Sequence, residues 1–279
     1  MGKNIRKVDK IKSFKWDGKD YQRFSGYQTE EGSKLIELLN VRNGESILDV
    51  GCGNGLLTLR MAKRTPEGFV IGIDSSGDML SKAEENRKAQ DVGNVDFQLK
   101  DVPSVDYENR FDAIFSNSAL HWIKYHGELL TRFYRALKPG GRIALGFASR
   151  GNIDSFLEII NHIMKDGEFS PSFKGFNFSW YFPGEEYKDL VKDAGFERCE
   201  VKFKSVEIKM TEEELMGWFR TVGMPYWGYL PEPLSGKFFD RVVNEYIKSR
   251  QGQGIAVVFK RVIVRGIRED SHFNGKSSC

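Results

Sequence analysis

The chain has 279 residues, of which 40% are hydrophobic and 29% charged, and this ordinary composition excludes an intrinsically disordered or a collagen-like protein. The 42 basic and 39 acidic residues leave a formal net charge of +3, which does not call for nucleic acid or an anionic membrane as a partner. No apolar run approaches the roughly 18 residues of a membrane span, and the start lacks the apolar core of a signal peptide, so we expect a cytoplasmic protein.

Residues 1–32 are expected to form an N-terminal arm. The first part of this arm is rich in lysine and shows no periodicity, whereas Trp16, Tyr21, Phe24 and Tyr27 follow closely on one another. So many aromatic residues favour a segment that folds back onto the body of the protein over a solvated tail.

Residues 33–150 alternate between short apolar runs and amphipathic stretches. The run Ser46–Val50, which glycines bound on both sides, is typical of a buried parallel strand. Further strands are expected at 69–74, 95–99, 111–116 and 142–147, with helices after Gly55 and at 78–89 and 128–137. This alternation predicts a parallel sheet with helices on both of its faces.

The alternation breaks after residue 150. The expected elements are a helix at 153–164, an aromatic stretch without periodicity at 169–182, and a helix that ends at Gly195. Alternating strands at 198–209 and 255–265 flank a second insertion that is rich in aromatic residues.

The strongest local pattern comes where the first strand turns into a helix, and it comprises Asp49, Gly51, Cys52, Gly53 and Gly55. Glycines let the backbone turn tightly and approach a ligand, and a helix N-terminus offers free N–H groups. The spacing differs from the G-x-G-x-x-G of dinucleotide-binding turns, and an acid before the first glycine suits a cationic ligand. Cys52 is interpreted as a small neutral residue rather than a nucleophile. The alternative is a turn that only packs a helix against a strand.

Polar residues also follow the next strands. Asp74 ends the second strand, where a carboxylate can bind both hydroxyls of a ribose, although capping a helix together with Ser75 is the alternative. Met79 could pack on a flat base or in the core. Asp101 could accept a hydrogen bond from an exocyclic amino group or lie solvated in a loop.

As a set, these residues resemble the class I S-adenosylmethionine-dependent methyltransferases over residues 40–150. The resemblance rests on the D-x-G-x-G-x-G turn, on Gly-Ile-Asp74-Ser-Ser, on Lys-Asp101-Val, on the run from Phe111 to Trp122, and on Leu137-Lys-Pro-Gly-Gly-Arg142. More narrowly, the segments 16–24, 116–122 and 218–226 resemble trans-aconitate methyltransferases, and malonyl-carrier-protein and juvenile-hormone-acid methyltransferases share parts of them. All of these are carboxyl O-methyltransferases.

The resemblance implies an α/β fold with a Rossmann-like sheet of seven strands, six parallel and one antiparallel. It also implies a small lid. The expected organisation is an arm at 1–32, a cofactor-binding core at 33–150, lid insertions at 151–183 and 210–252, the remainder of the core sheet at 184–209 and 253–268, and a flexible tail at 269–279.

The resemblance further implies that S-adenosylmethionine is the cofactor. In that reading Asp49 and the loop of Gly51, Cys52, Gly53 and Gly55 hold the methionine part, Asp74 with Ser75 the ribose, and Met79, Asp101 and Val102 the adenine. Ser116 and Asn117 end the fourth strand beside the topological switch, and Tyr21 and Gln28 close over the cofactor.

His121 and Trp122 follow the fourth strand and are expected to face the transferred methyl group. Trp122 would wall the acceptor pocket, and His121 would donate a hydrogen bond that orients the acceptor without taking a proton from it. The alternative is that Trp122 is a core aromatic residue and His121 its satisfied neighbour.

We therefore expect O-methylation of a carboxylate on a small-molecule acceptor, because a carboxylate is ionised at neutral pH and needs no general base. One alternative is C- or N-methylation of a quinone, isoprenoid or amine, with His121 or a lid tyrosine as the base. The other is a non-catalytic domain that binds the cofactor. The histidines and cysteines lack metal-ligand spacing, so no metal is expected. The sequence Ser116-Asn-Ser-Ala argues against nucleic-acid bases, and nothing in the sequence indicates the oligomeric state.

Overall fold

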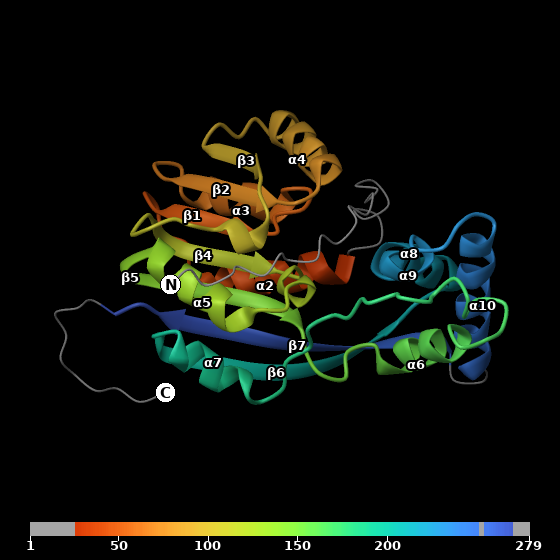
Figure 1. The fold of residues 1–279 in the computed structure, drawn as a ribbon. Helices are drawn as coiled ribbons and strands as arrows, with labels where there is room; N and C mark the ends of the chain where they lie inside the picture. Colours follow the sequence, from red (N-terminus) through yellow and green to blue (C-terminus); the bar gives the residue numbers. More distant parts are fainter. Residues whose placement is uncertain (1–25, 251–253, 270–279) are drawn as a thin grey trace, which may run out of the picture.

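The computed structural model describes residues 26–250 and 254–269. They form a seven-stranded sheet in the order β3-β2-β1-β4-β5-β7-β6 (Figure 1). The strands are β1 (Ser46–Val50), β2 (Phe69–Asp74), β3 (Val95–Leu99), β4 (Phe111–Asn117), β5 (Leu137–Ala148), β6 (Glu197–Lys209) and β7 (Ala256–Ile267). Strand β7 runs antiparallel to both β5 and β6, and the other neighbours are parallel. The predicted Rossmann-like sheet of six parallel strands and one antiparallel strand is confirmed.

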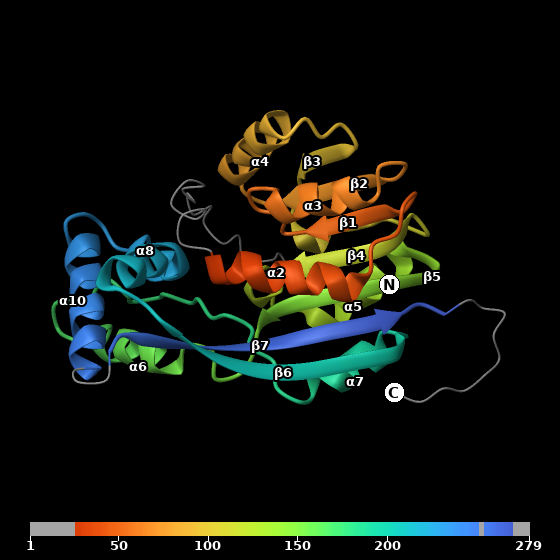
Figure 2. The same ribbon diagram turned by 180° about the vertical axis from the view of Figure 1, so that it is seen from behind.

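Helices cover both faces of the sheet (Figures 1 and 2). The helices are α2 (Gly26–Leu39), α3 (Leu56–Arg64) and α4 (Gly77–Ala89), then α5 (His126–Ala136) and α7 (Tyr187–Asp193). Leu35 and Ile36 of α2 pack with Leu59 of α3 on one face, and Phe133 of α5 packs with Tyr187 of α7 on the other. Because both faces are covered, β1 is buried at four of its five positions, including that of Asp49.

Strand β5 begins earlier than its sequence pattern predicts, at Leu137 rather than at Arg142. Leu137 pairs with Phe111 of β4, and the N–H of Gly140 donates to the carbonyl of Arg268 beyond the end of β7. These partners satisfy the backbone of the Lys-Pro-Gly-Gly stretch, so pairing with distant segments extends the strand through residues with low strand propensity.

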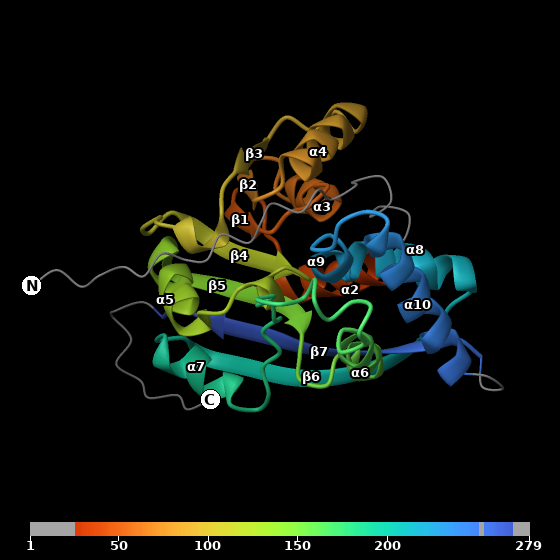
Figure 3. The same cartoon turned by 45° about the vertical axis from the view of Figure 1, so that its right-hand side comes forward.

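A second hydrophobic core lies at one end of the sheet, in the segments expected to form the lid, and we call this unit the lid. It is built by α6 (Asp154–Ile163), α8 (Glu212–Val222), α9 (Met224–Trp227), α10 (Leu234–Ser249) and the irregular segment 169–182. The lid lies off the carboxyl ends of β4 and β5, and the start of α2 points towards it (Figures 1 and 3). Residues 1–25 of the expected arm and 270–279 of the expected tail lie outside the described residues.

The antiparallel ribbon of β6 and β7 connects the sheet to the lid. Strand β7 pairs with β5 only from Arg261 onward, whereas the preceding residues from Ala256 pair with β6 alone. Val257 and Phe259 in that overhang belong to the lid core. Arg261 is therefore the residue at which the sheet ends and the lid begins.

A largely buried ion pair links the middle of β5 to Glu45, the residue that precedes β1. Arg142 donates to the two carboxylate oxygens of Glu45 at 2.7 and 2.8 Å and to the carbonyl oxygens of Leu39 and Asn40. We predict that Arg142→Met lowers the free energy of unfolding by about 3 kcal/mol, because the Glu45 carboxylate stays buried without its partner.

The matched control is Arg135→Met, since Arg135 pairs with Glu108 on the surface, with both side chains more than 60% exposed. Such a pair contributes less than about 1 kcal/mol. Urea denaturation of both variants checks the difference, and equal losses would contradict the assignment.

Candidate active site

The glycine-rich loop between β1 and α3 is tightly held on one side and open on the other. Gly51, Gly53 and Gly55 have φ values of +73°, +53° and +76°, a region that glycine adopts without strain. A Cβ atom on Gly51 would lie 2.2 Å from the Cβ of Ala119, whereas a Cβ on Gly53 would have no neighbour within 4 Å among the residues that the structure describes. The loop thus leaves room for a ligand at Gly53.

Asp49, the acid before this loop, is 2% exposed and accepts a hydrogen bond of 2.6 Å from the hydroxyl of Thr58. Burial raises the pKa of Asp49 to about 7, and the nearby charge of Asp74 raises it further. A cation placed beside this carboxyl group would favour its ionised form and so gain affinity.

Asp74 joins the glycine loop to the end of β2. One carboxylate oxygen accepts from the N–H of Gly53 and the other from the N–H of Ser76, both at 2.9 Å. Burial raises the pKa of Asp74, hydrogen bonds from these N–H groups oppose the rise, and the charge of Asp101 adds to it. A carboxylate has about four acceptor positions, so Asp74 can still accept from ligand hydroxyls.

The remaining residues predicted on this side differ in exposure. Met79 is 5% exposed, and Ser75 and Asp101 are exposed. Burial raises the pKa of the Cys52 thiol, which is therefore protonated at neutral pH. Val102 is half-buried and packs against the core.

The end of β4 links the sheet to α2 and β7. Ser116 is fully buried and donates to the carbonyl of Val50 at 2.7 Å. Asn117 donates to the carbonyl of Gln28 at 2.9 Å and accepts from Arg261 at 2.7 Å. The sequence analysis did not find Arg261, because Arg265 follows in the same alternation and only the structure shows that Arg261 is buried whereas Arg265 is exposed.

His121 lies in a short helical turn, η2 (Leu120–Trp122), just beyond β4. Its Nδ1 atom is buried and has no hydrogen-bond partner among the described residues. Burial, followed by the charges of Arg261 and His126, lowers the pKa of His121 to about 3. His126 differs, because its two ring nitrogens contact the hydroxyl of Tyr187 at 2.7 Å and the carbonyl of Leu120 at 3.0 Å.

Aromatic side chains of the lid surround this turn. The ring centroid of Trp122 lies 5.8 Å from that of Phe178 and 5.9 Å from that of Trp180. The ring centroid of His121 lies 6.4 Å from that of Phe182. The N–H of Tyr181 donates to the carbonyl of His121, which ties the segment in place. The structure therefore brings His121 and Trp122 together with the lid, whereas Tyr21 lies outside the described residues.

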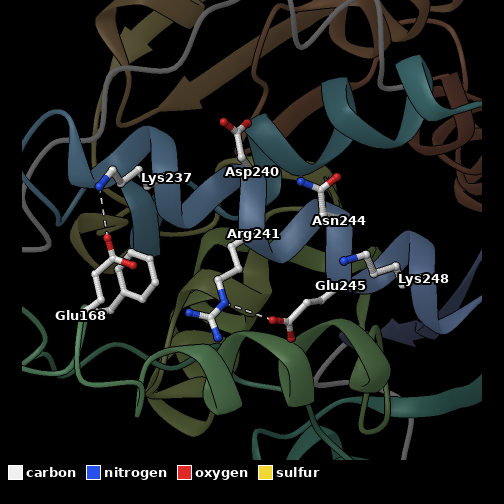
Figure 4. A pocket seen from close by; sticks show the side chains of 8 residues that line it. Glu168, Lys237, Asp240, Arg241, Asn244, Glu245 and Lys248 are labelled. Atoms are coloured by element: carbon white, nitrogen blue, oxygen red, sulfur yellow. Dashed lines mark hydrogen bonds and ion pairs between the residues drawn. The ribbon is translucent and has the colours of Figure 1, made fainter.

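A hollow of about 510 Å³ lies elsewhere, over α10 (Figure 4). Its charged side chains pair with one another: Lys237 with Glu168 at 3.2 Å, and Arg241 with Glu245 at 3.1 Å. It shares no residue with the glycine loop or the end of β4, so we place the candidate active site at the carboxyl edge of the sheet.

Comparison with known proteins identifies the family of this chain. The "Methyltransferase domain" family matches residues 42–182, half of the chain. A trans-aconitate 2-methyltransferase of Deinococcus radiodurans is 35% identical over 130 residues, which cover 47% of this chain and 48% of that protein. The match thus spans about half the length of this relative.

Two solved structures share the fold. The YcgJ protein of Bacillus subtilis has a TM-score of 0.61 at 18% identity, over 87% of this chain and 100% of that one. Phosphoethanolamine N-methyltransferase 2 of Haemonchus contortus has a TM-score of 0.60 at 20% identity, over 91% of this chain and 57% of that one.

The chain therefore belongs to the methyltransferase-domain family. Within it, the chain resembles the class I S-adenosylmethionine-dependent methyltransferases of the trans-aconitate group, two of which it matches over about half of their length. In residues 26–250 and 254–269 there is no cluster of side chains that could hold a metal ion, and no helix there is long and apolar enough to cross a membrane.

The raised pKa of Asp49 gives a pH-dependent prediction for the cofactor-free protein. The folded carboxyl group has a pKa of about 7 and an unfolded one about 3.9, so the folded state binds the proton more tightly between these values. Wild-type stability should fall as the pH rises through this window, and Asp49→Asn should escape that loss.

Between pH 5 and pH 8, the free energy of unfolding of Asp49→Asn should rise relative to that of the wild type by on the order of a few kcal/mol, at about 1.4 kcal/mol per pKa unit. Denaturation curves at the two pH values measure the gain, with the exposed Asp78→Asn as the matched control. A difference that does not change with pH would refute the shifted pKa.

Proposed function

We propose that this protein transfers the methyl group of S-adenosylmethionine to a carboxylate oxygen of a small-molecule acceptor. The observation that carries the proposal is the state of His121, a buried imidazole beside the end of β4 whose pKa is lowered to about 3. Such a group is neutral at physiological pH and a weak base, so it suits an acceptor that needs no deprotonation.

The glycine loop and the acids beside it fit the cofactor. The open position at Gly53 can receive the methionine part, with Asp49 facing its positive charge. In the same proposal Asp74 and Ser75 bind the ribose, Met79, Asp101 and Val102 surround the adenine, and Ser116, Asn117 and Gln28 border the cofactor from the β4 side. The Ser116 hydroxyl already donates to the carbonyl of Val50, so Ser116 would contribute to the shape of the cofactor site and not to a hydrogen bond with the cofactor.

When bound, S-adenosylmethionine supplies an electrophilic methyl carbon on a sulfonium sulfur. An acceptor carboxylate is ionised above about pH 4 and attacks with an oxygen lone pair, while the electrons of the broken bond stay on sulfur. The protein therefore has to align the two reactants and exclude water. Trp122 and the lid aromatics Phe178, Trp180 and Phe182 can do both by closing the acceptor side.

The relatives and the histidines both favour a carboxylate over the alternatives. The similar Deinococcus protein carries the name trans-aconitate 2-methyltransferase, and trans-aconitate is a carboxylate. Methylation at carbon or at an ammonium group requires a base, but His121 is a weak one and both nitrogens of His126 are occupied.

Asp74→Ala should weaken cofactor binding at least tenfold. The change removes an acceptor for ligand hydroxyls and frees the N–H groups of Gly53 and Ser76, and hydrogen bonds to charged groups contribute about 1.5–3 kcal/mol each. Calorimetry with S-adenosylhomocysteine measures the loss. The matched control is Asp78→Ala, an exposed position in the first turn of α4, which should bind S-adenosylhomocysteine as the wild type does. A loss below fivefold in Asp74→Ala would exclude the ribose role.

His121→Gln should lower turnover about ten- to a hundredfold, the contribution of one or two polar contacts at about 1.4 kcal/mol per decade, without changing cofactor affinity. The wild-type rate should stay flat from pH 6 to pH 9, because a carboxylate needs no deprotonation there. Steady-state kinetics over that range check both statements. A rate that rises near the ordinary histidine pKa in the wild type but not in His121→Gln would mean that His121 acts as a base, and full turnover in the variant would remove it from the site.

A further inference from the structure

The backbone adopts a strained conformation at Ser118, the residue that follows β4. Its φ of +58° lies in the left-handed region, which is unfavourable for a residue that carries a Cβ atom. Asn40, Asp91 and Asn109 lie in the same region, but their side chains are of the types that visit it readily. Strain of this kind persists only where neighbouring groups fix the backbone, so the surroundings of Ser118 must hold it in place.

Arg261 holds this turn from the side of β7. It is 5% exposed, and its guanidinium donates to Oγ of Ser118 at 2.9 Å and to Oδ1 of Asn117 at 2.7 Å. The backbone N–H of Ser118 donates to the carbonyl of Gly146 in β5 at 2.7 Å. A Cβ atom on Gly146 would lie 2.9 Å from the guanidinium, so the glycine leaves the space in which Arg261 reaches the turn. One guanidinium thus binds the side chains on both sides of a single peptide bond.

The turn leads the chain across the glycine loop and into η2. Ala119 lies so close to Gly51 that a Cβ atom on Gly51 would come within 2.2 Å of the Cβ of Ala119. The N–H of Trp122 donates to the carbonyl of Ala119 at 3.1 Å, and the N–H of Tyr181 in the lid donates to the carbonyl of His121 at 2.9 Å. One short segment therefore contacts the glycine loop on one side and the lid on the other.

We infer that Arg261 is a positioning residue for methyl transfer, because it holds Ser118 in the left-handed conformation that places η2 relative to the glycine loop. The inference rests on the proposed function, in which His121 and Trp122 of η2 lie on the acceptor side. Methyl transfer depends on the alignment of the two reactants, and a displacement of about 1 Å can cost on the order of a hundredfold in rate.

The glycine loop itself is held from β2 and does not depend on Arg261. The N–H groups of Gly51 and Cys52 both donate to the carbonyl of Ile73, at 2.8 and 3.0 Å. Loss of the hydrogen bonds from Arg261 should therefore loosen η2 and leave the affinity for the cofactor unchanged.

Two substitutions of Ser118 test the inference with the least disturbance. Ser118→Ala and Ser118→Gly both remove the hydroxyl that accepts from Arg261, but only alanine keeps the cost of the left-handed conformation. Hydrogen exchange is measured at the amides of Trp122, Ile123 and Tyr181, which donate to carbonyls of Ala119 and η2. Ser118→Ala should exchange these amides about five- to tenfold faster than the wild type, and Ser118→Gly should stay within about twofold of it. A position that only packs would give the opposite order, since glycine has more backbone freedom than alanine.

Arg261→Met removes the donor to both oxygens and should speed exchange at the same amides by about ten- to a hundredfold. Arg261→Lys keeps the charge and one donor group, so it should recover part of the protection. In the Arg261→Met background, Ser118→Ala should add little, because no guanidinium remains to bind the hydroxyl. The matched control is Arg265→Met on the same strand, which loses an exposed side chain 3.9 Å from Glu200 and should leave these amides unchanged.

The role in the reaction is measured with methyl-labelled S-adenosylmethionine and fractionated cell extract. In Ser118→Ala the rate of label transfer should fall about tenfold, whereas calorimetry should show the wild-type affinity for S-adenosylhomocysteine. In Ser118→Gly, label transfer should stay close to that of the wild type. If Arg261→Met does not fold, the contrast between the two Ser118 variants decides.

Unchanged exchange in Ser118→Ala would overturn the inference, and so would faster exchange with undiminished label transfer. An affinity for S-adenosylhomocysteine that falls as far as label transfer would overturn it as well. If the variants behave as expected but the labelled product is stable to base, the positioning role of Arg261 stands and the proposed carboxyl methylation fails. An ester product together with unchanged exchange gives the reverse result.

Discussion

The reversal of strand order between β1 and β4 is the constraint on which the candidate site depends. Strand β1 pairs with β2 on one side and β4 on the other, so the chain leaves β1 and β4 towards opposite faces of the sheet. In open α/β sheets this divergence creates a crevice at the carboxyl ends of the strands. The glycine loop leads into α3 on one side of the crevice, and η2 follows β4 on the other. At the base of the crevice, the hydroxyl of Ser116 in β4 donates a hydrogen bond to the carbonyl of Val50 in β1.

The two sides of this crevice carry opposite charge. Asp49 lies near the end of β1, Asp74 ends β2 and Asp101 follows β3, whereas Arg261 lies on β7 where the sheet meets the lid. Burial raises the pKa values of Asp49 and Asp74, whereas Asp101 is exposed. An acidic side suits a cationic cofactor, and a basic side suits an anionic acceptor. The charges of the protein therefore favour binding of the two reactants on opposite sides of the crevice.

The sequence predicted what depends on short-range patterns. Short apolar runs that alternate with helical stretches identified β1 to β4, and the loop of Gly51, Gly53 and Gly55 was recognisable because its spacing is local. Arg261 was missed because its partner Asn117 is 144 positions away, and no local pattern reports such a contact. His121 and His126 are alike in sequence, and only the contact of His126 with Tyr187 distinguishes the satisfied histidine from the one beside the lid. The aromatic stretch 169–182 has no period because the lid core, rather than a helix or strand, determines its conformation.

The central claim is that the methyl group goes to a carboxylate oxygen, and the chemical stability of the product tests it most directly. The protein is incubated with methyl-labelled S-adenosylmethionine and fractionated cell extract, and the labelled product is then treated with mild base. The proposed function predicts that the label is released as methanol, because base hydrolyses a methyl ester. A label that remains on the product after base treatment would place the methyl group on carbon, nitrogen or an ether oxygen, and would contradict it.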